Sequence, residues 1–255
     1  MEALKFTLSG NSAFFKDNVI NTVYLTYGNI HRVALLGMFG AILGYGGYGK
    51  QNDMLKKKNK KMPDYPEFYE KLKDIKISIV SNGKNGCFNK KLQTFNNSVG
   101  YASKEEGGNL IVKQFWLENP SWDIYILLDC EETKKIADYI KNRKAVYLPY
   151  LGSNDHLANI TDVEIINIEK KTSSDNETIE ILSMVKASDI SDKKKNAFII
   201  DDNMKKDIHK YSEYLPVALS KDLNQHEKEK MTITNMSVIL KKSYYKVEDK
   251  NIVFY

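Results

Sequence analysis

The chain has 255 residues, of which 42% are hydrophobic, so it is long enough to bury a core and has the composition of a globular protein. Its longest uncharged run, residues 33–49, is rich in glycine and shorter than the roughly 20 apolar residues of a membrane-spanning helix, which argues against a transmembrane segment. Cys87 and Cys130 have no close cysteine or histidine partner in the sequence, which argues against a disulfide framework and against a zinc site of the usual spacing.

The chain begins with the patterns of a strand and a helix. Apolar and polar residues alternate over residues 4–8, which predicts a strand, and Met1 leads into it without an apolar signal sequence. We therefore expect a cytoplasmic protein that has no membrane partner. Helical periodicity then runs from Ile30 to Leu43, with Asn29 as the expected N-cap.

A lysine-rich run follows this helix. Residues 50–61 hold six lysines and one acid, a local charge equal to the formal net charge of +5 of the whole chain. Two interpretations are open at this point, a solvated loop and a contact with a polyanion such as a nucleic acid.

The middle of the chain alternates between strand and helix patterns. After a short helix pattern at residues 63–73 and a strand at 75–79, residues 82–109 are rich in glycine and asparagine, and we expect them to form a long excursion, a flexible hairpin. The further elements expected in this half are strands at 110–117 and 122–128, a helix at 131–142 and a strand at 145–150.

This order of elements predicts an α+β fold. Strand, helix, strand, strand, helix and strand, with one extra strand, match the ferredoxin-like or RRM-like unit, which we assign to residues 1–160. Residues 161–255 are mostly β-patterned, and we expect a β-rich C-terminal region there. Its strands are expected at 163–168, 178–185, 197–200 and 231–240, with a closing hairpin at 244–255.

The start of the first predicted helix carries an unusual pair of cations. Only two of the 38 Lys and Arg residues are arginines, and one of them, Arg32, lies with His31 in the first helical turn if Asn29 is the cap. The helix dipole disfavours cations there by under about 1 kcal/mol. A helix N-terminus binds phosphate, however, and arginine offers a planar fork to it. The equally weighted alternative is a pair of side chains that point away or meet a local acid.

Polar, aromatic and glycine residues near this helix are suited to single-stranded RNA, because exposed bases stack on aromatic rings and bare backbone approaches phosphates closely. The alternatives are ordinary surface loops and a helix-capping turn. The residues concerned are Lys16, Asn21, Tyr24, Thr26 and Tyr27 before the helix, and Tyr45, Gly46, Gly47, Tyr48 and Lys50 after it.

Three segments together resemble CRISPR-associated protein family five, and more narrowly its type I-B branch: FKDNVINTVYLTYGNIHRVALLGMFGAILGYGGY, FWLENPSWDIYILLD and YLPYLGSNDHLANI. The first is the most specific, and together they lie in order within residues 1–160. Members of this family are RAMP-superfamily subunits of the Cascade interference complex.

The resemblance implies a non-catalytic, cofactor-free subunit at the foot of Cascade, whose RRM-like domain and projecting hairpin grip the 5′ handle of CRISPR RNA for antiviral DNA interference. It implies four partners: CRISPR RNA, the backbone subunits whose filament the protein caps, the large subunit that it helps to seat, and target DNA near the foot. It places Arg32 and the Gly44–Gly49 loop against the RNA, and with them Gly152, Ser153 and Asn154. Lys90 and Lys91 supply the cations of the hairpin in this interpretation.

Two other functions are weighed against this one. In type I-C systems one branch of the family cleaves precursor RNA with a tyrosine, a lysine and a histidine, without metal. The nearest grouping here is Lys16, Tyr27 and His31, and cleavage through a 2′-OH requires positioned acid and base groups. A metal-independent endoribonuclease is therefore the alternative, and a membrane-surface protein using the lysine run is a third. No Walker loop, nucleophile elbow or metalloenzyme histidine spacing is present.

Overall fold

The computed structural model describes residues 1–19, 22–55, 63–98, 100–101, 104–174, 177–191, 198–199, 208–221 and 223–255. Its centre is a four-stranded antiparallel sheet. The strands are β1 (Glu2–Ser9), β3 (Ile77–Ser81), β6 (Ser121–Leu127) and β7 (Asn159–Asn167), in the order β3-β6-β1-β7.

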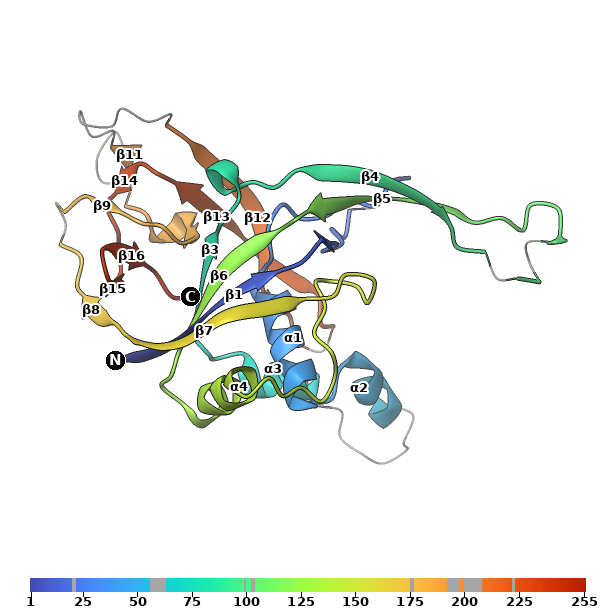
Figure 1. Ribbon diagram of the computed structural model, residues 1–255, viewed down its shortest axis with the longest axis horizontal. Helices are drawn as coiled ribbons and strands as arrows, with labels where there is room; N and C mark the ends of the chain where they lie inside the picture. Colours follow the sequence, from blue (N-terminus) through green and yellow to red (C-terminus); the bar gives the residue numbers. More distant parts are fainter. Residues whose placement is uncertain are drawn as a thin grey trace.

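Two helices connect these strands in the ferredoxin-like manner. Helix α1 (Arg32–Leu43) links β1 to β3, and α4 (Glu131–Lys141) links β6 to β7, so each helix joins two parallel strands that have one antiparallel strand between them. Both helices lie on one side of the sheet, together with α2 (Tyr48–Leu55) and α3 (Glu67–Leu72) (Figure 1). The α+β fold class predicted from the sequence is confirmed.

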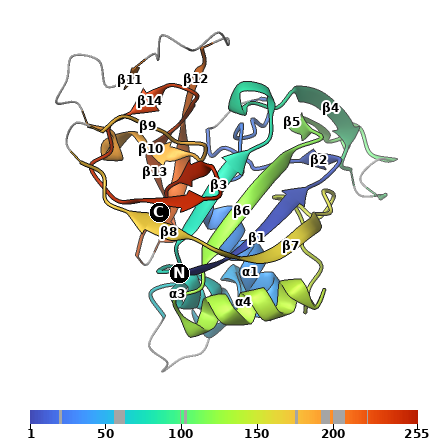
Figure 2. The same ribbon diagram turned by 60° about the vertical axis from the view of Figure 1, so that its left-hand side comes forward.

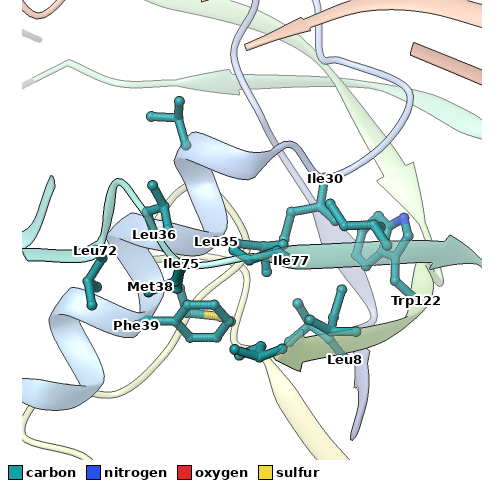
Figure 3. Close-up of a cluster of buried hydrophobic side chains, with 14 of the residues drawn as sticks. Leu8, Ile30, Leu35, Leu36, Met38, Phe39, Leu72, Ile75, Ile77 and Trp122 are labelled. Carbon is teal, nitrogen blue, oxygen red and sulfur yellow. The ribbon is translucent and has the colours of Figure 1, made fainter. Parts of the chain in front are cut away.

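The main hydrophobic core lies between the sheet and α1. Leu35 and Phe39 of α1 are fully buried with Leu8 and Ile77 of the sheet (Figure 3). A close contact between helices completes the layer, because a Cβ added at Gly40 would lie 2.4 Å from the Cβ atom of Phe68 in α3. This glycine therefore fixes how near α3 can come to α1.

The C-terminal region covers part of the other side of the sheet. Strands β15 (Tyr244–Val247) and β16 (Lys250–Ile252) form a hairpin that pairs with β8 (Glu169–Lys171), and their apolar side chains pack on Tyr125 and Leu127 of β6. The closing hairpin predicted from the sequence is confirmed.

The rest of this region forms two further three-stranded sheets (Figure 2). Strand β13 (His226–Thr234) lies between β10 (Val185–Lys186) and β12 (Lys210–Leu219), and β14 (Ser237–Val238) lies between β9 (Ile179–Glu180) and β11 (Phe198–Ile199). A β-rich C-terminal region is thus present, and some of its strands match the expected ones, since β7 overlaps the range 163–168 and β11 lies within 197–200. The ranges 178–185 and 231–240, however, each contain parts of two strands, and β12 was not predicted.

A two-stranded arm projects from the body of the molecule along its longest axis (Figure 1). It consists of β4 (Lys90–Asn96) and β5 (Ile111–Glu118), and β5 also pairs with the short β2 (Ser12–Ala13) at the base of the arm. The sequence predicted a hairpin within residues 82–109. A projecting hairpin is present, but its returning strand is β5, and residues 84–86 form a 3₁₀ turn before it.

Two local expectations are wrong. Residues 145–150 contain no strand of the sheet, since only Tyr150 makes an isolated bridge, and β7 supplies the fourth strand instead. The N-cap of α1 is His31 rather than Asn29. The amide of Asn29 is buried and bonds the Gly86 carbonyl oxygen and the Trp122 indole nitrogen, at 3.0 Å each.

The predicted division of the chain into residues 1–160 and 161–255 stays a prediction; β7 itself extends to Asn167. None of the helices in the described ranges combines the length and the apolar character that crossing a bilayer requires.

Candidate RNA interface

One face of the arm carries polar and aromatic side chains. Residues that are directly opposite in an antiparallel pair share a face, so Lys91 shares its face with Trp116, and Gln93 with Gln114. Tyr24 joins them, because it forms a parallel bridge with Gln114. We call this face, as defined by these five residues, the arm face. It offers a cation, amides and rings to a ligand.

The chain segment around Tyr24 runs beside β5 as an additional extended piece. The backbone N–H of Tyr24 donates to the Lys113 carbonyl oxygen at 2.9 Å, and the N–H of Phe115 donates to the Tyr24 carbonyl oxygen at 3.0 Å. The ammonium nitrogen of Lys16 lies 4.1 Å from the centre of the Tyr24 ring. Lys16 itself bridges to Thr26, and both Lys16 and Tyr24 are exposed. A cation and a ring are therefore available side by side.

The loop that contains Gly152, Ser153 and Asn154 lies against the base of the arm face. The ring of His156 meets that of Trp116 edge to face at 4.5 Å, and its Nδ1 atom lies 2.7 Å from the Ser12 hydroxyl oxygen. Gly152 and Asn154 are exposed and Ser153 is half-buried. The family resemblance places these residues with RNA, and the contact of His156 with Trp116 brings their loop beside the arm face.

Lys90 and Lys91 have different surroundings although both are exposed. Lys90 faces away from the arm face and donates from its Nζ atom to the Thr26 carbonyl oxygen at 3.0 Å. Thr26 is buried, and its hydroxyl accepts a hydrogen bond from the backbone N–H of Phe15. Lys90 and Thr26 therefore hold the arm to the Tyr24 segment, whereas Lys91 is available to a ligand on the arm face.

Tyr27 and His31 lie inside the protein. They are 2% and 6% exposed, and their rings meet edge to face at 5.3 Å. The His31 Nδ1 atom accepts from the backbone N–H of Ala34 and so caps α1. Burial, with the nearby His226 and Lys228, lowers the pKa of His31 to about 3, so its ring is neutral at pH 7.

Arg32 is buried as well. It is 8% exposed, and its guanidinium donates from Nη2 to the carbonyl oxygens of Lys73 and Ile75, at 2.6 and 2.7 Å, and from Nε to that of Tyr255, at 3.3 Å. Arg32 is therefore not the accessible cation that a phosphate contact at the helix start would require. Its planar guanidinium donates to main-chain carbonyl oxygens and not to a phosphate. These hydrogen bonds connect α1 to the segment before β3 and to Tyr255.

The residues from Tyr45 to Lys50 follow the other end of α1, after the left-handed C-cap Gly44. Glu67 of α3 accepts a hydrogen bond from the Gly46 backbone N–H at 2.8 Å and pairs with Lys50 at 3.1 Å; these contacts lower the pKa of Glu67 to about 2. The Tyr45 hydroxyl bonds Glu132 of α4, and the exposed Tyr48 packs on Phe68. Residues 45–50, Gly47 among them, therefore contact α3 and α4 and do not contribute to the arm face. Asn21 and residues 56–61 of the lysine run lie outside the described residues.

The open face of the four-stranded sheet is ill-suited to stacking bases. RRM domains stack bases on aromatic rings of their central strands. Here Tyr125 on that face is buried beneath the C-terminal hairpin, and Thr7 donates to the neighbouring Asp123 at 3.0 Å. A carboxylate also repels phosphate. The arm face is therefore the better candidate.

Sequence reasoning missed three arm-face residues, Gln93, Gln114 and Trp116. The alternating pattern of residues 110–117 did predict a strand, but not that this strand pairs with residues 90–96.

No protein-family model matches the chain, and no curated protein matches it. Among solved structures, it is similar to a chain of a "CRISPR RNA-guided surveillance complex", with 11% identity, a TM-score of 0.52, and 94% of this chain and 91% of that chain covered. A CRISPR protein from Archaeoglobus fulgidus has 11% identity and a TM-score of 0.48, with 99% and 98% covered. A chain of a type III-B Cmr-beta complex bound to cognate target RNA has 13% identity and a TM-score of 0.46, with 94% and 86% covered. Only the similarity to the chain of the surveillance complex bears on the fold, and it shows that the two chains share a fold over nearly their whole lengths.

Proposed function

We propose that this protein is a non-catalytic RNA-binding subunit of a CRISPR effector complex, and that its arm face and the adjoining Gly152–Asn154 loop bind the 5′ handle of CRISPR RNA. The observation that carries the proposal is the arm face together with Lys16, where the exposed cations Lys16 and Lys91 lie beside the rings of Tyr24 and Trp116. Single-stranded RNA is recognised by this combination, since phosphates need cations and unpaired bases need rings.

The fold supports the same proposal. The chain shares it, over 94% of its length, with a chain of a CRISPR RNA-guided surveillance complex. The resemblance of residues 1–160 to CRISPR-associated protein family five adds the finer assignment. In that assignment the protein belongs to a cytoplasmic type I-B Cascade, where it caps the filament of backbone subunits and helps to seat the large subunit near target DNA.

We propose binding without cleavage because the three residues that could perform acid–base chemistry are poorly placed for it. Lys16 is exposed, but Tyr27 and His31 are buried, and burial raises the pKa of the Tyr27 hydroxyl. A general base must reach the proton that it removes, and no 2′-OH can reach a ring that is 6% exposed without rearrangement of the protein.

The test is incubation of the purified protein with repeat RNA in EDTA, followed by separate analysis of the bound and free RNA. We expect intact RNA that is retained by the protein. Rapid cleavage that is lost in His31→Asn would establish the endoribonuclease instead. Absence of any binding to RNA that carries the handle would reject the RNA-binding function.

A further inference from the structure

An exposed apolar ridge lies on the segment between α4 and β7. Val146, Tyr147, Leu148 and Tyr150 are 54%, 62%, 75% and 45% exposed, and Leu157, which bridges to Tyr150, is 62% exposed. We call these five side chains the ridge. Single exposed apolar residues are ordinary on protein surfaces, whereas a contiguous group marks an interaction site.

The ridge is held rigidly although its side chains are exposed. The backbone N–H groups of Val146 and Tyr147 donate to the carbonyl oxygens of Ile42 and Ala41 at the end of α1, at 2.9 and 3.2 Å. The Val146 side chain packs where a Cβ on Gly44 would stand, 3.0 Å away. The N–H of Ala158 donates to the Pro149 carbonyl oxygen at 3.1 Å. A partner that binds this surface would therefore meet a preorganised chain and lose little affinity to ordering it.

The ridge has a basic border. Lys141, Arg143 and Lys144 directly precede it and are exposed, and residues 141–150 contain no acid. None of these three cations forms an ion pair with another described residue. Carboxylates on a partner would pair with these cations, because a positive patch on one side of an interface usually faces a negative patch on the other.

From these observations we propose that the ridge is a docking surface for another protein, one that presents an apolar segment bordered by carboxylates. Tyrosine and arginine are the residue types enriched at the energetic centres of protein interfaces. A second copy of this chain fits less well, because a symmetric dimer through the ridge would place the basic borders of both copies close together. RNA is a less suitable ligand for the ridge, because its exposed leucines, Leu148 and Leu157, can neither stack on a base nor form hydrogen bonds with one.

This inference rests on the proposed function only in naming where to look for the partner, namely among the protein subunits of the same effector complex. It adds the place and the chemistry of the contact. The ridge adjoins the Gly152–Asn154 loop along the chain, so the partner would sit next to the handle of the RNA.

The first experiment places a photo-cross-linking amino acid at position 148 and co-expresses the protein with the other subunits of its complex and CRISPR RNA. We expect cross-links to one protein segment that contains apolar and acidic residues. Cross-links confined to RNA, or to a second copy of this chain, would overturn the proposal. So would sedimentation of the protein with anionic vesicles that is lost in Leu148→Ser.

The second experiment compares Tyr147→Ser with Tyr214→Ser, since both tyrosines are 62% exposed and Tyr214 lies on β12, outside the ridge. Tyr147→Ser and Arg143→Glu should each weaken binding of the cross-linked subunit by about tenfold or more, while Tyr214→Ser leaves it unchanged. The Tyr147→Ser protein should keep its thermal midpoint and its affinity for handle RNA.

The two experiments separate the two claims. If the Tyr147→Ser protein binds the cross-linked subunit as tightly as the wild type does and also binds RNA normally, the docking surface is rejected and the proposed function is unaffected. Loss of RNA affinity in Tyr147→Ser would make the ridge part of the RNA interface and would also overturn the inference. Cross-links to an acidic protein segment by a chain that binds no RNA would support the docking surface and reject the RNA-binding function.

Discussion

Lys16 and Tyr24 come from neighbouring extended segments, and the lysine holds its ammonium nitrogen 4.1 Å from the centre of the tyrosine ring. The pair is positioned by backbone contacts on both sides, the Lys16–Thr26 bridge and the hydrogen bonds of Tyr24 with β5. A base that stacks on the exposed ring would have its phosphate within reach of the cation. This relationship is why we locate the RNA interface at the base of the arm.

The ring of Tyr24 should contribute through stacking. Tyr24→Ala should weaken handle binding by roughly 1–3 kcal/mol, the usual value of one stacked base, whereas Tyr24→Phe should bind nearly as well as the wild type. Fluorescence anisotropy with labelled handle RNA measures both. Tyr214→Ala is the matched control for loss of an exposed ring. Equal losses in the Ala and Phe variants would show that stacking is not what Tyr24 contributes.

Arg32 should matter for stability and not for RNA. Lysine cannot reproduce three hydrogen bonds donated from two nitrogen atoms of a planar group, so Arg32→Lys loses at least one of these hydrogen bonds. The cost should be on the order of 2 kcal/mol in the free energy of unfolding, read from urea denaturation. The exposed Arg143 provides the control, since Arg143→Lys should leave stability unchanged. Weaker RNA binding by Arg32→Lys at unchanged stability would restore the interpretation made from sequence.

His31 should make the fold sensitive to acid. Its pKa is about 3 in the folded protein and 6.5 when unperturbed, so between these values the unfolded chain binds more protons than the folded one. The stability contributed by neutral His31 is therefore complete above pH 6.5 and is lost as the pH falls toward 3. Lowering the pH from 7 to 5 should cost on the order of 2 kcal/mol, at about 1.4 kcal/mol per pH unit.

The control is His31→Asn, which keeps a side-chain acceptor at the N-cap but cannot titrate. It should show a smaller difference in unfolding free energy between pH 7 and pH 5 than the wild type. The difference should not vanish, because burial also lowers the pKa of His226 and of His156. An identical difference in variant and wild type would mean that His31 is not the group responsible.

Gly152 should tolerate no side chain. Its φ is +93°, and a Cβ there would lie 1.9 Å from the Phe14 carbonyl oxygen. Gly152→Ala should lower the free energy of unfolding by about 2 kcal/mol or more, because the backbone beside β2 must move. Gly47→Ala is the matched control, since nothing lies within 4 Å of its added Cβ. Thermal unfolding of both proteins decides the point, and equal midpoints would contradict the role assigned to Gly152.

Much of the fold could be predicted from sequence because its signals are local. The alternation of residues 4–8 and the 3.6-residue period of residues 131–142 are visible within one element, and β1 and α4 follow. The choice of the fourth strand is not local. Residues 145–150 and 159–167 both have β-like composition, and only pairing with β1 selects the second. Strand β12 was missed because its first half is polar and half-exposed.

The candidate site also has some features with local sequence signals and others that depend on non-local contacts. The aromatic and basic character of the segment around Tyr24 is visible in the sequence, and so is the glycine at position 152. The burial of Arg32 is not, because its acceptors are carbonyl oxygens of residues 73, 75 and 255, which every residue type carries. The polar face shared by Gln93 and Gln114 depends on the register of the arm, which a chain of alternating residues does not specify by itself.

The most direct test of the central claim is the affinity for 5′-handle RNA, measured in EDTA by anisotropy over a range of salt concentrations, for the wild type and for Lys16→Glu/Lys91→Glu. Reversal of the exposed Lys246 and Lys250 on the C-terminal hairpin is the control. We predict that the arm variant binds at least about tenfold more weakly, while the control matches the wild type. The slope of log affinity against log salt should also become less steep by roughly 1.4, because two lysines no longer neutralise phosphates. Equal affinity and slope in the arm variant and the wild type would contradict the assignment of the RNA interface to the arm.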